Sequence, residues 1–210
     1  MPDMPLTQTR LDELWDFSDA PASEQRLRRA AEAARGAERA ELLTQVARAL
    51  GLQERFAEAD AVLDDVAAGP DADDAAVRAR TALERGRVRN SAGDAAAAVP
   101  LFAEAERTAA AAGLTFLQVD ALHMIAIASP DGTGATDAAL AVLEGVTDPR
   151  TLRWRVGLHN NRGWAFFDAE RYEEALASFV ASRDAAERWG TAQQVQWADE
   201  AIAETVQHLA

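Results

Sequence analysis

Cysteine and lysine are both missing from this chain of 210 residues. Without cysteine there is no disulfide, no thiolate metal site and no cysteine nucleophile. All 21 basic residues are arginine, which indicates GC-rich codon usage and a bacterial source. The sequence has no run of about 18 consecutive apolar residues, and residues 1–10 lack a basic segment followed by an apolar one. We therefore expect a cytoplasmic protein that makes no use of a membrane.

Basic charge and histidine are also scarce. The formal net charge is -14 at pH 7, which argues against a nucleic-acid partner, because such binding depends on clustered basic side chains. The three histidines, His123, His159 and His208, each lack a second ligand four residues away, so we expect no metal and no cofactor. The glycines at 132 and 134 do not form a phosphate-binding loop, because no lysine follows them.

Alanine is abundant and makes up about a quarter of the chain. Runs of β-branched residues are absent, and Gly and Pro stand mostly between segments whose apolar residues follow helical spacing. This composition predicts an almost entirely helical protein without strands.

One spacing of small and large residues recurs along the chain. Gly163 is followed 12 positions later by Ala175 and 16 positions later by Phe179. A small residue on each of two helices allows close approach, and a large residue fills the space beside the contact. The same offsets hold at two further places, which are Gly86, Ala98 and Phe102, and Ala47, Ala59 and Leu63.

This spacing resembles the signature of the tetratricopeptide repeat, a hairpin of two helices. The second-helix alanines recur every 36 to 41 residues, which is longer than the usual period of about 34. The chain is thus similar to arrays with extended helices, as in kinesin light chains and bacterial regulators, over residues 37–190. The resemblance implies an all-α fold, namely a right-handed superhelical α-solenoid of antiparallel helix hairpins, and a concave groove that binds protein or peptide.

The domain organisation follows from this register. We predict a single domain over residues 1–210, with a degenerate N-terminal hairpin at 7–35, repeats at 37–69, 73–112, 115–147 and 149–189, and a solitary capping helix at 191–209. In the repeat at 115–147, the break at 129–134 is unusually long, so either Ala138 or Ala139 can take the alanine position. That break is either a tolerated insertion or a binding edge.

Helix ends and packing faces are also predicted. The second helix is expected from about residue 23 to 35, and a long helix from Pro149 to Asp168. The expected packing face of the last helix consists of Val195, Trp197, Ala201 and Val206. The expected caps are Asp73 or Asp74, Asp148, and the capping box from Thr191 to Gln194.

Four polar residues depart from the repeat signature. Arg85 and Arg89 stand at positions that are usually apolar, and His159 and Arg162 replace a tryptophan and a leucine. We predict that the helices are loosely packed at these places or that the arginines are paired.

The resemblance places ligand-binding residues on the inner face of the first helix of each repeat. Arginines there would bind carboxylates, asparagines would hydrogen-bond a peptide main chain, and tryptophan would anchor an apolar side chain. We therefore expect a protein or peptide partner that is acidic or bears a carboxylate. The alternative is that the arginines are solvated or paired with neighbouring acids. The candidate residues are Arg48, Arg80, Arg87, Asn90, His123, Asn160, Trp164 and Phe167.

Two other functions stay open beside a non-catalytic scaffold. One is a regulatory domain that senses a small molecule or peptide, and the other is an enzyme built around Asp120 and His123, which lie one helical turn apart. We expect no enzyme, because the sequence assembles no nucleophile with its base. A peptide track predicts polar residues along all the first helices, whereas an enzyme predicts one deep pocket with strongly shifted pKa values.

Overall fold

The computed structural model describes residues 6–129 and 132–209, and all regular secondary structure in these residues is helical. Contacts divide the chain into two compact units, Met1–Pro130 and Asp131–Ala210, and each unit is described by itself. The division falls inside the repeat predicted at 115–147. Residues 130 and 131 of its long break lie outside the described residues.

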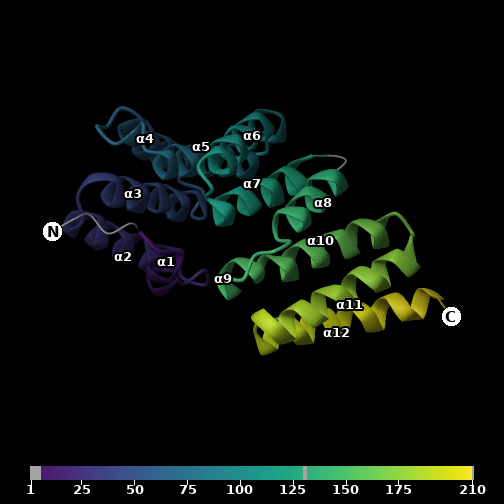
Figure 1. Ribbon diagram of the computed structural model, residues 1–210. Helices are drawn as coiled ribbons and strands as arrows, with labels where there is room; N and C mark the ends of the chain where they lie inside the picture. The colour runs from purple at the N-terminus through teal and green to yellow at the C-terminus, as the bar shows by residue number, and fades with distance from the viewer. Residues whose placement is uncertain (1–5, 130–131, 210) are drawn as a thin grey trace. The chain divides into compact units, whose positions relative to one another are not determined.

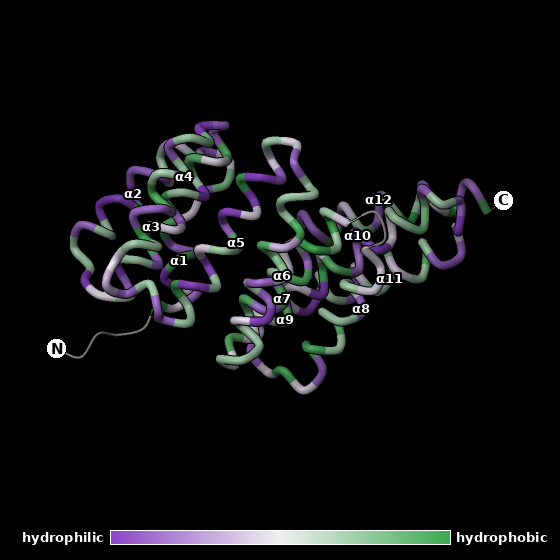
Figure 2. The backbone as a smooth tube through the Cα atoms, turned by 90° about the horizontal axis from the view of Figure 1, so that it is seen from above, coloured by the Kyte–Doolittle hydropathy of each residue, from purple (hydrophilic) through white to green (hydrophobic). Residues whose placement is uncertain are grey.

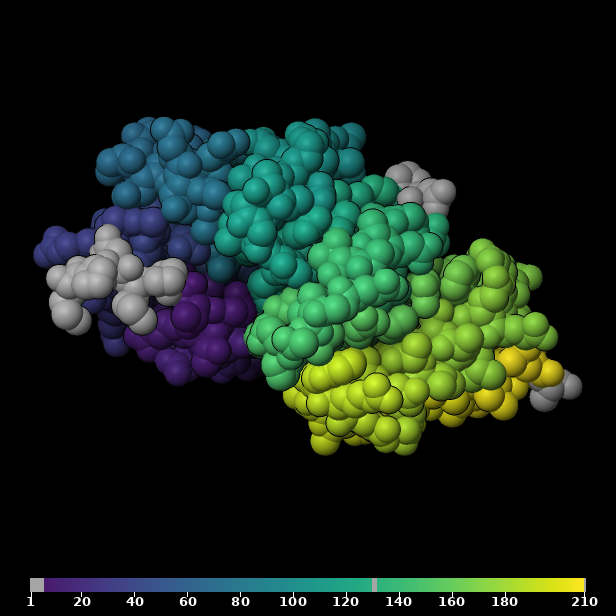
Figure 3. All heavy atoms as spheres, viewed as in Figure 1, coloured from purple at the N-terminus to yellow at the C-terminus, as the bar shows by residue number. Residues whose placement is uncertain are grey.

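Helices of the first unit follow one another as packed hairpins (Figure 1). Each helix contacts its neighbours in the chain, and α3, α5 and α7 also pack side by side in that order. Side chains fill the spaces between the ribbons (Figure 3). The helices are α1 (Gln8–Leu14), α2 (Ala20–Ala33), α3 (Gly36–Gly51), α4 (Phe56–Ala67), α5 (Ala75–Ser91), α6 (Ala95–Ala111) and α7 (Thr115–Ala128).

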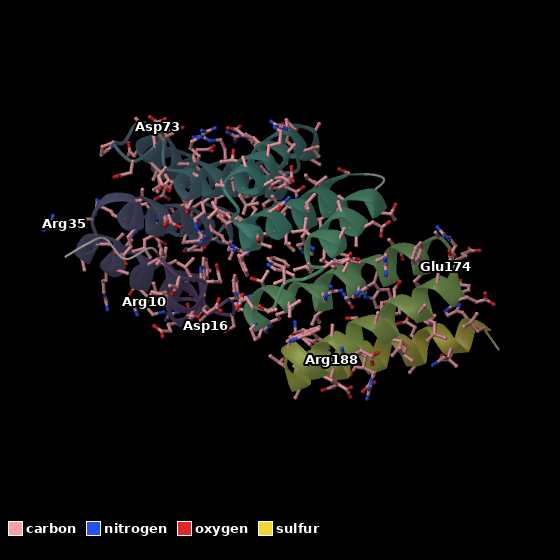
Figure 4. All side chains as sticks on the ribbon, in the orientation of Figure 1. Arg10, Asp16, Arg35, Asp73, Glu174 and Arg188 are labelled. Atoms are coloured by element: carbon pink, nitrogen blue, oxygen red, sulfur yellow. The ribbon has the colours of Figure 1, made fainter. Side chains whose placement is uncertain are left out.

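Helix α2 begins three residues earlier than predicted. Asp19 is its N-cap and accepts a hydrogen bond from the Ala22 backbone N–H at 2.9 Å. Pro21 therefore stands in the first turn, where its missing N–H has no partner to lose. Of the two predicted caps of α5, Asp74 is the correct one and accepts from the backbone N–H groups of residues 76 and 77. Asp73 lies in the preceding turn (Figure 4).

The recurring small–small–large spacing is confirmed as the packing contact of three hairpins. A Cβ added at Gly86 would stand 2.6 Å from Cδ1 of Phe102, and one at Gly163 would stand 2.6 Å from Cδ1 of Phe179. Such distances are well inside van der Waals contact, so only glycine fits under these rings. The other residues of the pattern are all fully buried, namely Ala47, Ala59, Leu63, Ala98 and Ala175.

In the second unit, α10 and α11 pack on each other, and the other helices of the unit pack on one or both of them. Apolar and polar residues interleave along its helices, as amphipathic packing requires (Figure 2). Acidic residues open α11 and Arg188 stands in its last turn, which suits the helix dipole (Figure 4). The helices are α8 (Thr133–Val142), α9 (Pro149–Leu152), α10 (Trp154–Asp168), α11 (Tyr172–Trp189) and α12 (Ala192–Leu209).

One prediction for this unit needs correction, and one open alternative is decided. The helix expected from Pro149 to Asp168 is interrupted at Arg153, although Asp148 caps its start as predicted, accepting from the Thr151 backbone N–H at 2.8 Å. Helix α8, which lies in the repeat predicted at 115–147, packs on α10 of the same unit. Its buried alanine is Ala139, because Ala138 is exposed.

The capping box of α12 is confirmed, but its predicted packing face is partly wrong. The Gln194 backbone N–H donates to the Thr191 hydroxyl at 3.3 Å, and the Thr191 backbone N–H donates to the Gln194 side chain at 3.1 Å. The buried face includes Ala201 as predicted, together with Ala198 and Thr205. The predicted packing residues Trp197 and Val206 are instead 57% and 47% exposed. The buried residues of this face are small, which allows α12 to lie close to α11.

The arginines that depart from the signature are paired, as one of the two predicted alternatives requires. Arg85 on α5 pairs with Asp64 of α4 at 2.8 Å, and Arg89 pairs with Asp60 at 3.0 Å. In the second unit, Arg162 pairs with Asp137 of α8 at 3.1 Å. These contacts hold neighbouring helices together where the signature would place apolar residues.

Candidate functional site

A cluster of charged side chains lies where α3, α5 and α7 pack side by side in the first unit. We call it the inner cluster; its members are Glu41, Gln45, Arg48, Arg80, Glu84, Arg87, Asp120 and His123. The charges of its three arginines and three carboxylates sum to zero. The cluster includes four of the predicted site residues, which are Arg48, Arg80, Arg87 and His123.

Arg80 is neutralised by an internal partner. Its Nε donates to Oε2 of Glu41 at 2.8 Å, and both side chains are buried. Burial raises the pKa of Glu41 even though the Arg80 guanidinium opposes the shift. Arg80 thus links α5 to α3, and its charge is already compensated before any ligand binds. This agrees with the alternative that the arginines are paired with neighbouring acids.

Arg87 holds two carboxylates at once. One guanidinium nitrogen donates to Oε1 of Glu84 at 2.6 Å, and another makes a short charged contact with Asp120 of α7. The Gln45 side-chain amide also donates to Oε1 of Glu84, at 3.2 Å. Oε2 of Glu84 is buried without a hydrogen-bond partner among the described residues. Because Glu84 and Asp120 are almost fully buried, Arg87 is required to compensate their charges.

Arg48 differs from these two arginines. Its guanidinium lies over the rings of Trp15 and Phe17, at 5.6 and 5.2 Å from their centroids, and it makes no hydrogen bond or ion pair to a described residue. The two rings are stacked on each other at 4.8 Å. Burial lowers the pKa of Arg48, and Arg87 lowers it further, while Glu84 and Asp120 oppose the shift. An arginine starts from so high a pKa that Arg48 stays charged at neutral pH.

Asp120 and His123 are neighbours, as their spacing predicted. Burial favours the neutral acid, but the guanidinium groups of Arg87 and Arg48 outweigh it and lower the pKa of Asp120. Burial lowers the pKa of His123, with Arg87 and Arg48 contributing, so the imidazole is neutral at pH 7. A carboxylate stabilised in its charged form is a weak proton acceptor, so this pair is poorly suited to general base catalysis.

The other four predicted site residues lie in different surroundings from one another. Asn90 lies one turn after Arg87 on α5, and its side chain makes no hydrogen bond to a described residue. In the second unit, Asn160 and Trp164 line a groove beside α12. Phe167 is partly buried, and its ring packs against those of Trp164 and Tyr172, with centroid distances of 5.4 Å in both cases.

His159 is half-buried in a separate hollow of the second unit. Burial lowers its pKa to about 4, with smaller contributions from Arg162 and Arg155. The hollow is also lined by Trp189 and Asp184. The imidazole is therefore neutral at physiological pH and contacts the Arg162 guanidinium through Nδ1 at 3.2 Å.

Sequence reasoning missed the aromatic partners of Arg48 and one acid of the inner cluster, Glu84. Glu84 could have been found, because it stands three residues before Arg87 and faces the same side of the helix. Nothing in the sequence pattern connects Trp15 to α3. The contact is made by the Trp15 indole N–H, which donates to Oε1 of Gln45 at 3.2 Å across 30 residues of chain.

No family model matches this chain, and no curated protein is similar to it at a significant level. Within residues 6–129 and 132–209, no helix combines the length and apolarity needed to cross a bilayer. In the same residues, no group of three or more His, Asp or Glu side chains is arranged to hold a metal ion.

Metal removal is expected to have no effect. Since no ligand set was found among the described residues, adding EDTA should leave the melting temperature unchanged. Differential scanning fluorimetry with and without EDTA checks this. A fall of several degrees, restored by adding back one divalent metal, would contradict the prediction.

Proposed function

We propose that this chain is a non-catalytic binding module of the tetratricopeptide type, whose first unit holds a peptide or protein segment through a carboxylate of that segment. The observation that carries the proposal is Arg48, a half-buried guanidinium without an ion pair among the described residues. A partly desolvated cation gains more from a carboxylate than a fully hydrated one does. The planar guanidinium also matches a carboxylate in bidentate fashion.

The aromatic pair beside Arg48 supports a peptide as the ligand. Phe17 is 61% exposed and stacks on Trp15, so a large apolar surface lies next to the guanidinium. Tryptophan and arginine are enriched among the residues that contribute most to binding at protein interfaces. A segment with a carboxylate and a neighbouring apolar side chain would contact both.

Because Arg80 and Arg87 are both ion-paired, the proposal assigns carboxylate binding to Arg48 alone. Each already compensates a buried carboxylate, so the expected set of three charge partners reduces to Arg48. The other two arginines would keep α3, α5 and α7 in place around it. The net charge of -14 opposes an acidic ligand at long range, but physiological salt screens charges beyond about 8 Å. The cytoplasmic location and bacterial source stay predictions from the sequence.

Replacing Arg48 with glutamine is expected to weaken binding of acidic peptides by a factor of roughly ten to one hundred, because a charge-assisted hydrogen bond contributes roughly 1.5–3 kcal/mol. The measurement is enrichment from a library of decapeptides, followed by calorimetric titration of the enriched peptides. Arg107→Gln is the matched control, since Arg107 is exposed on α6 and outside the inner cluster.

Two outcomes would count against the proposal. If the enriched peptides carry no excess of acidic residues, the carboxylate assignment fails. If free glutamate binds as tightly as the enriched decapeptides, the alternative of a small-molecule sensor replaces the peptide scaffold.

A further inference from the structure

The second unit contains a groove between α10 and α12, with α11 at its floor. Its volume is about 400 Å³, which lies within the range of ligand-binding pockets, roughly 300–1,000 Å³. We call it the α10–α12 groove. Its lining residues include Asn160 and Trp164 of α10, Ser182 of α11, and Trp197, Glu200 and Glu204 of α12.

The polar lining of this groove is negatively charged. Glu204 is exposed and makes no hydrogen bond or ion pair to a described residue, and Glu200 accepts one hydrogen bond, from the Gln196 amide at 2.8 Å. Ser182 donates its hydroxyl to the Val156 carbonyl at 2.9 Å, so its oxygen offers acceptor sites. The lining holds two carboxylates and no arginine. Such a surface is complementary to a cation.

Two tryptophans complete the groove. The Trp197 side chain is 57% exposed, although a tryptophan on the surface leaves a large apolar area in water. Trp164 packs edge-on against Phe179 at 5.0 Å, which fixes its position at the opposite wall. The face of an indole ring attracts Lys and Arg side chains more strongly than that of other aromatic residues.

We propose that the α10–α12 groove binds a basic peptide segment, with an arginine or lysine side chain against Trp197 and its charge paired with Glu200 and Glu204. Residues 197, 200 and 204 lie on one face of α12, and the first and last are seven positions apart, or about 10 Å along the helix. This row is longer than one cationic head group. It suits an extended segment that carries more than one basic residue, and Asn160 is free to hydrogen-bond its main chain.

The ligand proposed for this groove is basic, whereas the ligand proposed for Arg48 is acidic. The sequence predicted that Asn160 and Trp164 would contact an acidic segment, whereas the carboxylates of α12 would repel one. The two sites lie in different units and are tested separately. Failure at Arg48 therefore leaves the groove proposal standing, and the reverse also holds.

The test uses the full chain and a synthetic decapeptide, acetylated and amidated, with three arginines separated by Gly-Ser. Calorimetric titration should show binding that weakens as salt is raised. Trp197→Ala should weaken it about tenfold, the effect of losing one good cation–π contact. Glu200→Gln together with Glu204→Gln should weaken it by a similar factor. Because Trp197 is exposed, its removal leaves the fold intact.

Two controls make the result specific. Glu173→Gln removes the same charge from an exposed site on α11 outside the groove, and it should bind the decapeptide as the wild type does. A matched decapeptide with glutamate in place of arginine should not bind. The proposal is overturned if that peptide binds equally well, if Trp197→Ala has no effect, or if arginine amide alone binds as tightly as the decapeptide.

Discussion

Replacing Gly163 with leucine is expected to lower the free energy of unfolding by about 3 kcal/mol, the upper part of the range for overpacked cores. Even a Cβ at this position would lie 2.6 Å from Cδ1 of Phe179. That ring is fully buried and contacts Trp164 as well, so it has no free space into which to move. Helices α10 and α11 would have to separate.

Gly134 supplies the matched control. It lies in the first turn of α8, is exposed, and has no atom within 4 Å of an added Cβ. Gly134→Leu should therefore be neutral or stabilising, since leucine favours a helix more than glycine does. Chemical denaturation of both variants measures the difference. If Gly163→Leu unfolds at the same denaturant concentration as Gly134→Leu, the assigned contact between α10 and α11 is wrong.

Replacing Arg87 with methionine is expected to destabilise the first unit by about 3–5 kcal/mol at neutral pH, the cost of leaving buried charges without their partner. Glu84 is 1% exposed and Asp120 is 3% exposed, so water cannot take the place of the guanidinium. Methionine keeps much of the apolar volume, which separates the loss of charge from the loss of packing. Arg107→Met, at an exposed position on α6, should change stability by no more than about 0.5 kcal/mol.

The effect of Arg87→Met should depend on pH in a defined direction. In the wild type the pKa of Asp120 is lowered below 3.8, so its contribution to stability is present above that pH and is lost as pH falls through the folded-state pKa. In the variant, the interactions with Arg87 that lower the pKa of Asp120 are lost, so burial meets less opposition and this pKa rises above its wild-type value. The variant is thus helped by protonation, and its deficit relative to wild type should shrink between pH 7 and pH 4. A deficit that stays constant over this range would contradict the role given to Asp120.

The sequence by itself was sufficient to predict the structural features that depend on residues close together in the chain. The contacts of Gly86 with Phe102 and of Gly163 with Phe179 join helices that are consecutive in the chain, so the offset between the residues reports the contact. The caps at Asp74 and Asp148 also follow from local hydrogen bonding within three residues. These features determine an all-helical chain built from hairpins.

The long break at 129–134 marked the one repeat whose organisation sequence could not determine. Helix α8 is only ten residues long and packs on α10, and the helix expected from Pro149 is interrupted at Arg153. Residue spacing alone does not determine against which neighbouring helix a short amphipathic helix packs. Its packing partner depends on which apolar surface is available in the folded unit.

Only the tertiary structure decided the character of the candidate sites. Arg80 and Arg87 find partners 39 and 33 residues away, on helices that become neighbours only when hairpins stack, whereas Arg48 lies over two aromatic rings and pairs with no carboxylate of the described residues. The same inner-face spacing therefore yields two arginines held in ion pairs and one, Arg48, that has none among those residues. Trp197 was predicted as a packing residue, yet the small residues Ala198 and Ala201 pack in its place and leave the indole beside Glu200 and Glu204. Sequence periodicity shows which residues share a helix face, but the charge and aromatic surface that a ligand meets depend on the partners supplied by other helices.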